Sequence, residues 1–388
     1  MDLTLKKLPD YDGIDGPLLF VIMDGVGIFR GEDEGYPGNA FEQSNPTHVR
    51  HLMENEKIVT QLQAHGTAVG MPSDGDQGNS EVGHNAIGAG RVFAQGARLV
   101  GEAIESRRLF DGPVWKEIIE NALENSTPVH FIGLLSDGNV HSNIAQLMAL
   151  VGECDDRGVE EVYVHTLLDG RDVPPISALA YVGELEDYLW SLRVQALKAG
   201  TTRRYFIASG GGRMVTTMDR SEADWSIVER GYNAHVLGEG AMFPDASTAI
   251  KRLREEEKVD DQYLPAFVIE DPEKPGAPVG EILDRHNVVF FNYRGDRALE
   301  ISRAFVEDDF SGFDRKRRPD VIYAGMMEYD GDTHMPPKYL VAPPEIDRTI
   351  SEYLAANGVT QFAISETQKF GHVTYFWNGN NSGKFNED

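Results

Sequence analysis

The residues that could do chemistry stand directly after short apolar runs of the sequence. Asp24 follows the first run, and Arg294 and Arg297 follow a later one. A carboxylate is a hard oxygen ligand for divalent metals, and arginine holds phosphate or carboxylate with a planar pair of N–H donors. One Asp-Gly or one Arg in such a place is most simply a turn or a surface ion pair. Because six runs end in this way, we favour a binding site.

The cationic candidates are five arginines that lie on or just after the runs. They are Arg171, Arg213, Arg220, Arg294 and Arg297. Together they would form a cradle for a small dianion in an otherwise acidic chain. His141 and Asp172 stand among them and are candidates for proton transfer. The structural alternatives are a surface imidazole for His141 and a helix cap for Asp172.

A glycine-rich stretch, residues 66–90, contains seven glycines in 25 positions and ends in a helical pattern that opens at Ser80. Glycine lets backbone amides approach a phosphate, and the start of a helix favours anions. Ser80 is therefore either the N-cap of that helix or a nucleophile that captures a phosphoryl group. The spacing alone does not choose between these two roles.

Short apolar runs that alternate with helical patterns must position these residues. The runs cover residues 18–23, 129–135, 159–168, 203–209, 287–293, 320–326 and 361–365, and clear helical patterns cover 142–158 and 176–200. This alternation predicts the α/β class, with parallel sheets that are covered by helices on both faces. Ligands of such sheets bind beyond the carboxyl ends of the strands, which is where the candidates stand.

Composition narrows the class of protein. The 388 residues include 63 Asp plus Glu against 36 Lys plus Arg, for a formal net charge of −27, so we expect no nucleic-acid and no membrane partner. The length predicts two or three domains. The single cysteine, Cys154, excludes a disulfide framework and fits a reducing cytosol. No apolar run near the amino terminus has the length of a signal peptide or membrane helix, so we expect a soluble, cytoplasmic protein.

With these residues in hand, the chain resembles the cofactor-independent phosphoglycerate mutase family of the alkaline phosphatase superfamily. The resemblance extends from about residue 18 to about residue 383. The matching segments are VIMDGVGI, GNSEVGHNAIGAGR, LLSDGNVHSN, HTLLDGRDVPP, GGGRMVTTMDR, DDQYLPAFVI, FNYRGDR, APPEIDRT and ETQKFGHVTYFWNGN. Several of them are long and specific to the family.

The resemblance implies two domains. One is an incomplete alkaline-phosphatase-like domain with a parallel sheet, formed by residues 1–95 and 342–388. The other is an α/β phosphotransferase domain, residues 96–341, inserted into it, with hinges at residues 95–97 and 342–344. The family's other metal ligands lie beyond the FWNGN segment, so we expect a chain truncated at its carboxyl end. We also expect apolar surface left uncovered around residues 18–23 and 361–365.

The activity that the resemblance implies is the interconversion of 3-phosphoglycerate and 2-phosphoglycerate, in glycolysis and gluconeogenesis, through a phosphoserine. Ser80 matches the nucleophile, Asp24 and Ser80 match metal ligands, and Lys369 matches a cation that stabilises the phosphate. The matches to the substrate-binding set are His141, Arg171, Asp172, Arg213, Arg220, Arg294 and Arg297. Asp172 is also the expected acid/base. The implied cofactors are two divalent ions, Mn²⁺ or Mg²⁺, without 2,3-bisphosphoglycerate.

Two alternatives remain from the sequence. Another phosphomutase of the alkaline phosphatase superfamily, such as a phosphopentomutase, or a phosphodiesterase would share the metal core, but those families lack the DGRDVPP and GGGRM segments. A non-catalytic remnant would bind phosphoglycerate without converting it. We expect a monomer in either case.

Overall fold

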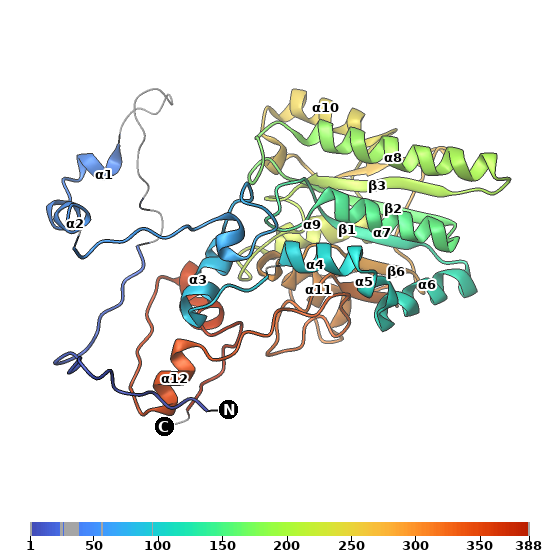
Figure 1. Ribbon diagram of the computed structural model, residues 1–388. Helices are drawn as coiled ribbons and strands as arrows, with labels where there is room; N and C mark the ends of the chain where they lie inside the picture. The colour runs from blue at the N-terminus through green and yellow to red at the C-terminus, as the bar shows by residue number, and fades with distance from the viewer. Residues whose placement is uncertain (1, 24–25, 27–38, 56, 95, 387–388) are drawn as a thin grey trace. The chain divides into compact units, whose positions relative to one another are not determined.

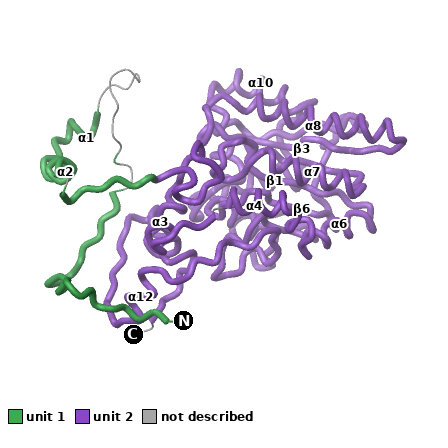
Figure 2. The backbone as a smooth tube through the Cα atoms, viewed as in Figure 1, with its two compact units in different colours: residues 1–63 green, residues 64–388 purple. Residues whose placement is uncertain are grey.

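The computed structural model describes residues 2–23, 26, 39–55, 57–94 and 96–386. They fall into two compact units, Met1–Gln63 and Ala64–Asp388, which Figure 2 shows in different colours. The first unit contains the short helices α1 (Ala40–Gln43) and α2 (Thr47–Met53). This division into two units does not test the expected insertion of residues 96–341 as a domain, which stays a prediction. Asp24 and residue 95 lie outside the described residues.

The second unit is built on a seven-stranded sheet with the order β4-β5-β3-β2-β1-β6-β7 (Figure 1). The strands are β1 (Val129–Leu135), β2 (Glu161–Leu168), β3 (Arg204–Gly212), β4 (Ala241–Phe243), β5 (Phe267–Ile269), β6 (Asn287–Phe290) and β7 (Ile322–Gly325). Every pairing is parallel except that of β3 with β5. The α/β class is confirmed.

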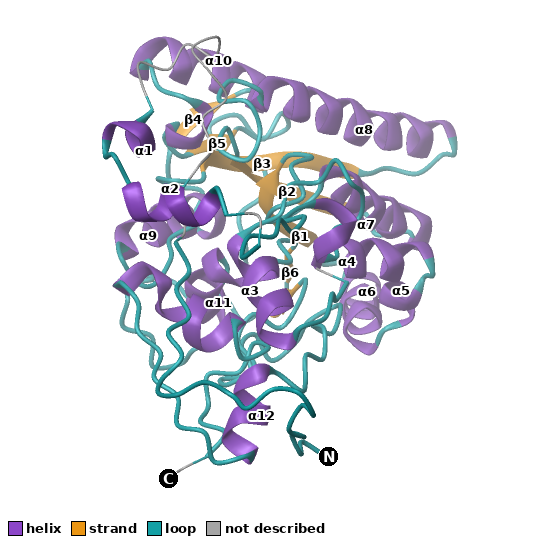
Figure 3. Ribbon diagram, turned by 60° about the vertical axis from the view of Figure 1, so that its left-hand side comes forward, coloured by secondary structure: helices purple, strands orange, loops and turns teal. Residues whose placement is uncertain are grey.

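Helices pack on both faces of the sheet (Figure 3). The α-helices of the second unit are α3 (Ser80–Ala89), α4 (Gly96–Glu105), α5 (Arg108–Asp111), α6 (Pro113–Asn125), α7 (Ile144–Arg157), α8 (Ala178–Lys198), α9 (Trp225–Val236), α10 (Ala246–Glu257), α11 (Leu299–Val306) and α12 (Ile350–Ala356). Because crossovers between parallel strands are right-handed, α7 and α8 share one face, and α11, which connects strands in the opposite direction, lies on the other. The contacts of α9 with α11 place it on that second face.

Local signals explain where the central elements begin and end. Asn143 caps α7 by accepting the N–H of Ala145, and Gly158 ends the helix in the left-handed conformation that glycine adopts without strain. All seven residues of β1 are buried, as expected for a parallel strand with helices on both faces. The predicted strands at 129–135, 159–168, 203–209, 287–293 and 320–326 are confirmed within a few residues.

Two predicted strands are wrong. Residues 18–23 and 361–365 are neither helix nor strand, and neither segment pairs with another strand in the described part of the chain. Apolar sequence gives a segment the propensity for a strand, but a strand exists only where a neighbour takes its backbone hydrogen bonds. The side chains are exposed, with Leu19 at 84% and Phe362 at 87%. The expectation of uncovered apolar surface in these two segments is therefore confirmed.

The register of the central strands gathers their carboxyl ends. Leu135, Leu168 and Gly212 are partners across β1, β2 and β3. The residues that follow these three positions therefore emerge side by side at one edge of the sheet. β6 runs parallel to β1, and its last residue, Phe290, is paired with Ile132, three residues before β1 ends.

Candidate active site

Four adjacent strand ends place charged side chains around one point. His141 follows β1, Asp172 follows β2, Arg213 follows β3, and Arg294 follows β6. Two further arginines, Arg220 and Arg297, belong to the same loops after β3 and β6. We call Arg213, Arg220, Arg294, Arg297, His141 and Asp172 the arginine cluster.

Arg213 is the centre of the cluster and is 1% exposed. Its Nη1 lies 3.0 Å from Asp169 Oδ1 and also contacts Asp172 Oδ2. Its Nη2 donates to His141 Nε2 at 2.7 Å. Because a guanidinium has only donors, Nε2 of His141 must accept, and the proton of the neutral imidazole lies on Nδ1.

His141 is therefore an oriented, neutral donor. Burial lowers its pKa well below the ordinary value, and the charges of Arg213, Arg294, Arg297 and Arg220 add to this effect. Nδ1 lies 3.8 Å from Asp296 Oδ1, which is too far for a hydrogen bond. The proton on Nδ1 thus lies near Asp296 but has no hydrogen-bond partner among the described residues.

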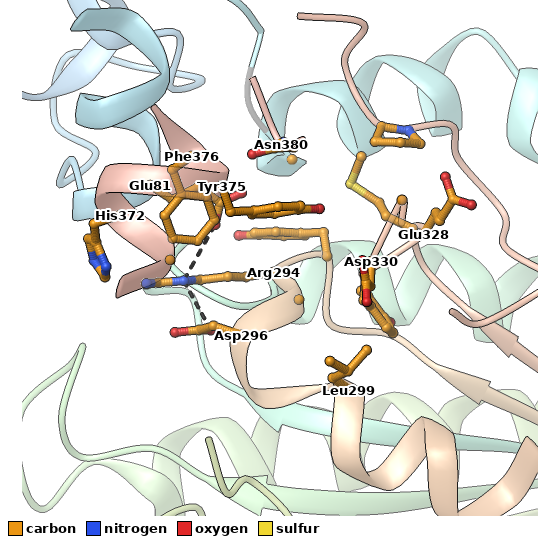
Figure 4. Close-up of a pocket in the computed structure, with 18 of the residues that line it drawn as sticks. Glu81, Arg294, Asp296, Leu299, Glu328, Asp330, His372, Tyr375, Phe376 and Asn380 are labelled. Carbon is orange, nitrogen blue, oxygen red and sulfur yellow. Dashed lines mark ion pairs between the residues drawn. The ribbon is translucent and has the colours of Figure 1, made fainter. Parts of the chain in front are cut away.

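Arg294 stands between two carboxylates. Its Nε is 3.1 Å from Asp296 Oδ1 and 3.6 Å from Glu81 Oε2 (Figure 4). Burial opposes the charge of Arg294, but these two carboxylates outweigh it and raise its pKa. Burial in turn raises the pKa of Glu81 to about 7, with Arg294 opposing. Glu81 is the second residue of α3, so this contact joins the helix of Ser80 to the cluster.

Arg297 and Arg220 complete the cationic set. Arg297 Nη1 donates to the carbonyl of Met218 at 2.6 Å. Burial lowers the pKa of Arg297 to about 10, and the neighbouring arginines add to this despite Asp296. Arg220 is 3.7 Å from Asp296 Oδ2 and donates to Gln368 at 3.1 Å. Burial is the main cause of this lowered pKa, and a bound anion would relieve the smaller contribution from the neighbouring arginines.

Several buried polar atoms of the cluster and of the adjacent Asp296 lack a hydrogen bond among the described residues. They are His141 Nδ1, Arg213 Nε, Arg294 Nε and Asp296 Oδ1. Although Arg294 Nε and Asp296 Oδ1 are within ion-pair distance, their geometry does not meet the angular requirement of a hydrogen bond. Because buried polar groups are nearly always paired, such a concentration of unpaired ones indicates a ligand site.

Arg171 is not part of this hydrogen-bonded set. Its side chain is exposed, although its charge contributes to the lowered pKa of Arg297. Its backbone N–H donates to Asp169 Oδ1 at 3.1 Å, as does that of Asp172 at 3.0 Å. Asp169 thereby shapes the loop that carries both predicted residues.

Ser80 is the first residue of α3. Asn79 is the N-cap, and its side chain accepts the N–H of Val82 at 3.2 Å. The capping alternative for Ser80 is therefore wrong, and its hydroxyl lies in the first turn of a helix, where anions are favoured. Its role as a nucleophile stays a prediction.

The segment that carries Lys369 packs against the same helix. A short π-helical turn, His372–Phe376, follows Lys369 closely in the sequence and contacts α3. Gly88 allows this contact, because a Cβ there would lie 2.0 Å from the carbonyl oxygen of Trp377. The rings of His84 and His372 meet edge to face with centroids 5.1 Å apart.

A cavity of about 1010 Å³ lies between these segments. Arg220 lines it. Arg294, Asp296, Glu81 and Tyr375 line it as well (Figure 4). The two residues that flank Ser80 in the sequence and the residue before Lys369 are also in its wall. The volume is ample for a three-carbon phosphate ester. Of the predicted site residues, only Arg220 and Arg294 line this cavity. The rest of the cluster, Ser80 and Lys369 are not in its wall, and the nucleophile segment reaches it through Asn79 and Glu81.

Sequence reasoning missed three residues of this site: Asp169, Asp296 and Glu81. The two aspartates stand in the charged runs after β2 and β6, so their position was a usable signal. Glu81 looks like any acidic residue in the first turn of a helix. Its burial against Arg294 depends on tertiary packing and has no local signal.

The described residues do not fit a metal site by themselves. No group of three or more His, Cys, Asp or Glu side chains among them could hold a metal ion. Of the two expected ligands, Ser80 is described and Asp24 is not. In the part of the chain that the structure covers, no helix is both long and apolar enough to span a membrane.

Comparisons of this chain with protein families and with curated proteins point to the same family. The family described as BPG-independent PGAM N-terminus (iPGM_N) matches residues 100–331. The 2,3-bisphosphoglycerate-independent phosphoglycerate mutase of Trypanosoma brucei brucei is 49% identical over 96% of this chain and 65% of its own length. The corresponding mutase 1 of Arabidopsis thaliana is 52% identical over 84% of this chain and 57% of its own length.

A solved structure agrees with these relatives. The structure of Leishmania mexicana phosphoglycerate mutase at low cobalt concentration has a TM-score of 0.80 and 50% identity, and the match covers 84% of this chain and 58% of that one. The present chain spans 56–66% of the length of these and similar curated relatives. A match of this identity over most of the chain shows that it belongs to the 2,3-bisphosphoglycerate-independent phosphoglycerate mutase family.

Proposed function

We propose that this chain binds phosphoglycerate in the arginine cluster and acts as a phosphoglycerate mutase, interconverting 3-phosphoglycerate and 2-phosphoglycerate in glycolysis and gluconeogenesis. The observation that carries the proposal is the set of unpaired buried polar atoms on His141, Arg213, Arg294 and Asp296, which follow strands β1, β3 and β6. A phosphoglycerate offers a carboxylate and a phosphate, which are the two anions that arginine binds with a planar pair of donors.

The arginines of the cluster differ in whether they line the cavity. Arg294 and Arg220 line it and are the first groups that an entering anion meets. Arg213 is held by Asp169, Asp172 and His141, so its main role is to orient the other groups. His141 then donates from Nδ1 to a ligand oxygen, and its neutral state leaves the net charge of the site to the arginines.

Ser80 and Asp172 take the chemical roles in this proposal. Ser80 Oγ attacks the phosphorus and its hydroxyl proton passes to water, so a P–Oγ bond forms and the bond from phosphorus to the substrate oxygen breaks. Asp172 supplies a proton to the glycerate oxygen that leaves. In the return step, the other glycerate hydroxyl gives its proton to Asp172 and attacks the phosphorus of the phosphoserine. The P–Oγ bond then breaks, and Ser80 Oγ takes a proton back from water. Lys369 stabilises the charge on the phosphoryl oxygens, and Arg171 contributes to the positive potential at the mouth of the site.

The cofactor part of the proposal is two divalent ions, Mn²⁺ or Mg²⁺. They would supply charge stabilisation for the phosphoryl group. Because the described residues form no such site on their own, no step above passes through a metal. The family is by name independent of 2,3-bisphosphoglycerate.

The proposed domain organisation is the inserted one, with residues 96–341 as the substrate-binding domain. The family match to residues 100–331 supports it, since that match falls within the predicted insert. We further propose a cytoplasmic monomer without nucleic-acid or membrane partners. A net charge of −27 and a buried free cysteine support this part of the proposal.

Phosphorus NMR of the full chain with 3-phosphoglycerate, with and without added Mn²⁺, tests the function. Appearance of 2-phosphoglycerate in the wild type and in a Ser106→Ala control, but not in Ser80→Ala, would support the mutase reaction. Saturable binding without conversion would favour the phosphoglycerate-binding alternative. Absence of any binding would contradict the proposal.

A further inference from the structure

A line of hydrogen-bonded histidines crosses the core behind the arginine cluster. His286 Nδ1 lies 2.9 Å from His130 Nε2, and His130 Nδ1 lies 3.0 Å from His165 Nε2. The line continues through the Ser209 hydroxyl, which is 2.7 Å from both His165 Nδ1 and His235 Nδ1. We call these four imidazoles and Ser209 the histidine chain. All of its members except His286 are buried.

The direction of every hydrogen bond in the histidine chain follows from one backbone group. The N–H of Leu283 donates to His286 Nδ1 at 3.2 Å, so this nitrogen carries no proton. His130 must then donate from Nε2 and accept at Nδ1. By the same rule, His165 donates from Nε2 to His130 and accepts from the Ser209 hydroxyl.

The far end of the chain is fixed as well. Ser209 has used its proton, so it accepts from Nδ1 of His235, and Nε2 of His235 is left as an acceptor. Thr217 Oγ1 lies 2.9 Å from that nitrogen and donates to it. The reverse polarity would place a proton on His286 Nδ1 against the N–H of Leu283, which is why only one arrangement is satisfied.

Thr217 lies in the loop that carries two arginines of the cluster, Arg213 and Arg220. Its φ is +70°, a conformation that a β-branched residue adopts only under constraint. Its hydroxyl packs on Gly231 of α9, where a Cβ would lie 1.9 Å from Oγ1. His235 is one helical turn further along α9, so Gly231 makes the space and His235 accepts the hydrogen bond.

Met218, the residue after Thr217, connects the constrained backbone of Thr217 to the arginine cluster. The carbonyl of Met218 accepts from Arg297 Nη1. The backbone N–H of Thr217 is also bound, to the carbonyl of Ile227 at 2.8 Å. The loop is therefore tied to α9 at Thr217 and to the cluster at Met218, and both ties lie between Arg213 and Arg220.

We propose that Thr217 and His235 are positioning residues that hold the loop of residues 213–220 in its ligand-binding conformation, and that the histidine chain fixes the tautomer of His235 that makes this possible. The inference rests on the proposed function only for the identity of the ligand. The hydrogen bonds and the constrained loop are independent of it.

The first test is nitrogen NMR of the full chain labelled with ¹⁵N-histidine. We expect Nε2-protonated neutral rings for His130, His165 and His286, and an Nδ1-protonated ring for His235. A His235 ring that carries its proton on Nε2 would overturn the inference.

The second test compares Thr217→Val, Thr217→Ser and the control Thr201→Val, whose hydroxyl bonds only to the carbonyl of Ala196 at the end of α8. Thr217→Val keeps the shape but leaves His235 Nε2 without a donor. We expect faster amide hydrogen exchange in residues 213–220 and about a tenfold or greater loss of affinity for 3-phosphoglycerate. Thr217→Ser, which keeps the hydroxyl, should restore both.

Unchanged loop exchange in a folded Thr217→Val variant would overturn the proposal. If that variant does not fold, Ser209→Ala, which removes the acceptor of His235 Nδ1, should raise loop exchange, and unchanged exchange there would overturn it. Failure of the wild type to bind 3-phosphoglycerate would refute the proposed function, while the exchange and tautomer results would still decide this inference.

Discussion

Arg294→Lys separates a ligand-binding arginine from a merely cationic one. The substitution retains the positive charge between Asp296 and Glu81 but removes the planar pair of donors. The side chain of Arg294 is 12% exposed, so solvent replaces the lost contacts poorly. The substitution therefore changes the geometry of anion binding far more than the charge of the site.

The size of the effect follows from the number of hydrogen bonds lost. A guanidinium that holds an anion by two N–H groups makes two charge-assisted bonds, and a lysine in its place keeps one. One such bond contributes about 1.5–3 kcal/mol, so the Kd for 3-phosphoglycerate should rise about 10- to 150-fold.

Isothermal titration calorimetry with 3-phosphoglycerate measures this change directly. The matched control is Arg252→Lys, at an exposed arginine that pairs with Glu256 one turn away on α10. Thermal unfolding of each variant verifies that the fold is retained. An Arg294→Lys protein that is folded and binds with the affinity of the control would refute the role assigned to Arg294.

Three further predictions concern the nucleophile, acid stability and exposed apolar sequence. Ser80→Ala should abolish phosphoenzyme formation, measured by mass spectrometry. It should change the stability little, because Asn79 and not Ser80 caps α3. Asn79→Ala, in contrast, should lower the free energy of unfolding, measured by chemical denaturation, by about 1 kcal/mol. The free energy of unfolding should fall as the pH drops from about 6.5 towards 4. Burial lowers the pKa values of the imidazoles of the histidine chain, to about 3 for His235 and about 4 for His286. In this pH range the unfolded chain therefore binds more protons than the folded one, which favours unfolding. The slope should be at most about 1.4 kcal/mol per pH unit for each histidine, and denaturation that is independent of pH in this range would contradict it. Phe362→Ser should reduce the self-association of the protein, measured by light scattering, because Phe362 is 87% exposed and Ile364 is 75% exposed. Equal scattering by the variant and the wild type would show that this segment does not cause self-association.

The sequence predicted the elements whose signal is local and long enough to be periodic. The central strands and the helices α7 and α8 lie within a few residues of their predicted ranges. β4 and β5 were missed because three residues are too few to show a period. Residues 18–23 and 361–365 have strand-like composition, yet pairing, which decides the matter, is a property of the neighbours.

The candidate site divides in the same way. Strand-end position was enough to select most of the arginine cluster, because the carboxyl ends of neighbouring parallel strands must meet. The tertiary partners could not be predicted from the sequence. Glu81 meets Arg294 only through the packing of α3. The histidine chain joins residues from β1, β2, β3 and α9 whose positions in the sequence follow no regular spacing. The constrained backbone of Thr217 likewise follows from packing against Gly231 and leaves no mark in the sequence.

The most direct test of the central claim is a crystal structure of the full chain with 3-phosphoglycerate. We expect ligand oxygens within about 2.7–3.2 Å of Arg294 and of His141 Nδ1, so that the buried polar atoms now unpaired acquire partners. A ligand bound elsewhere, with Arg294 still facing only Asp296 and Glu81 and His141 Nδ1 still unpaired, would contradict the assignment of the arginine cluster as the phosphoglycerate site.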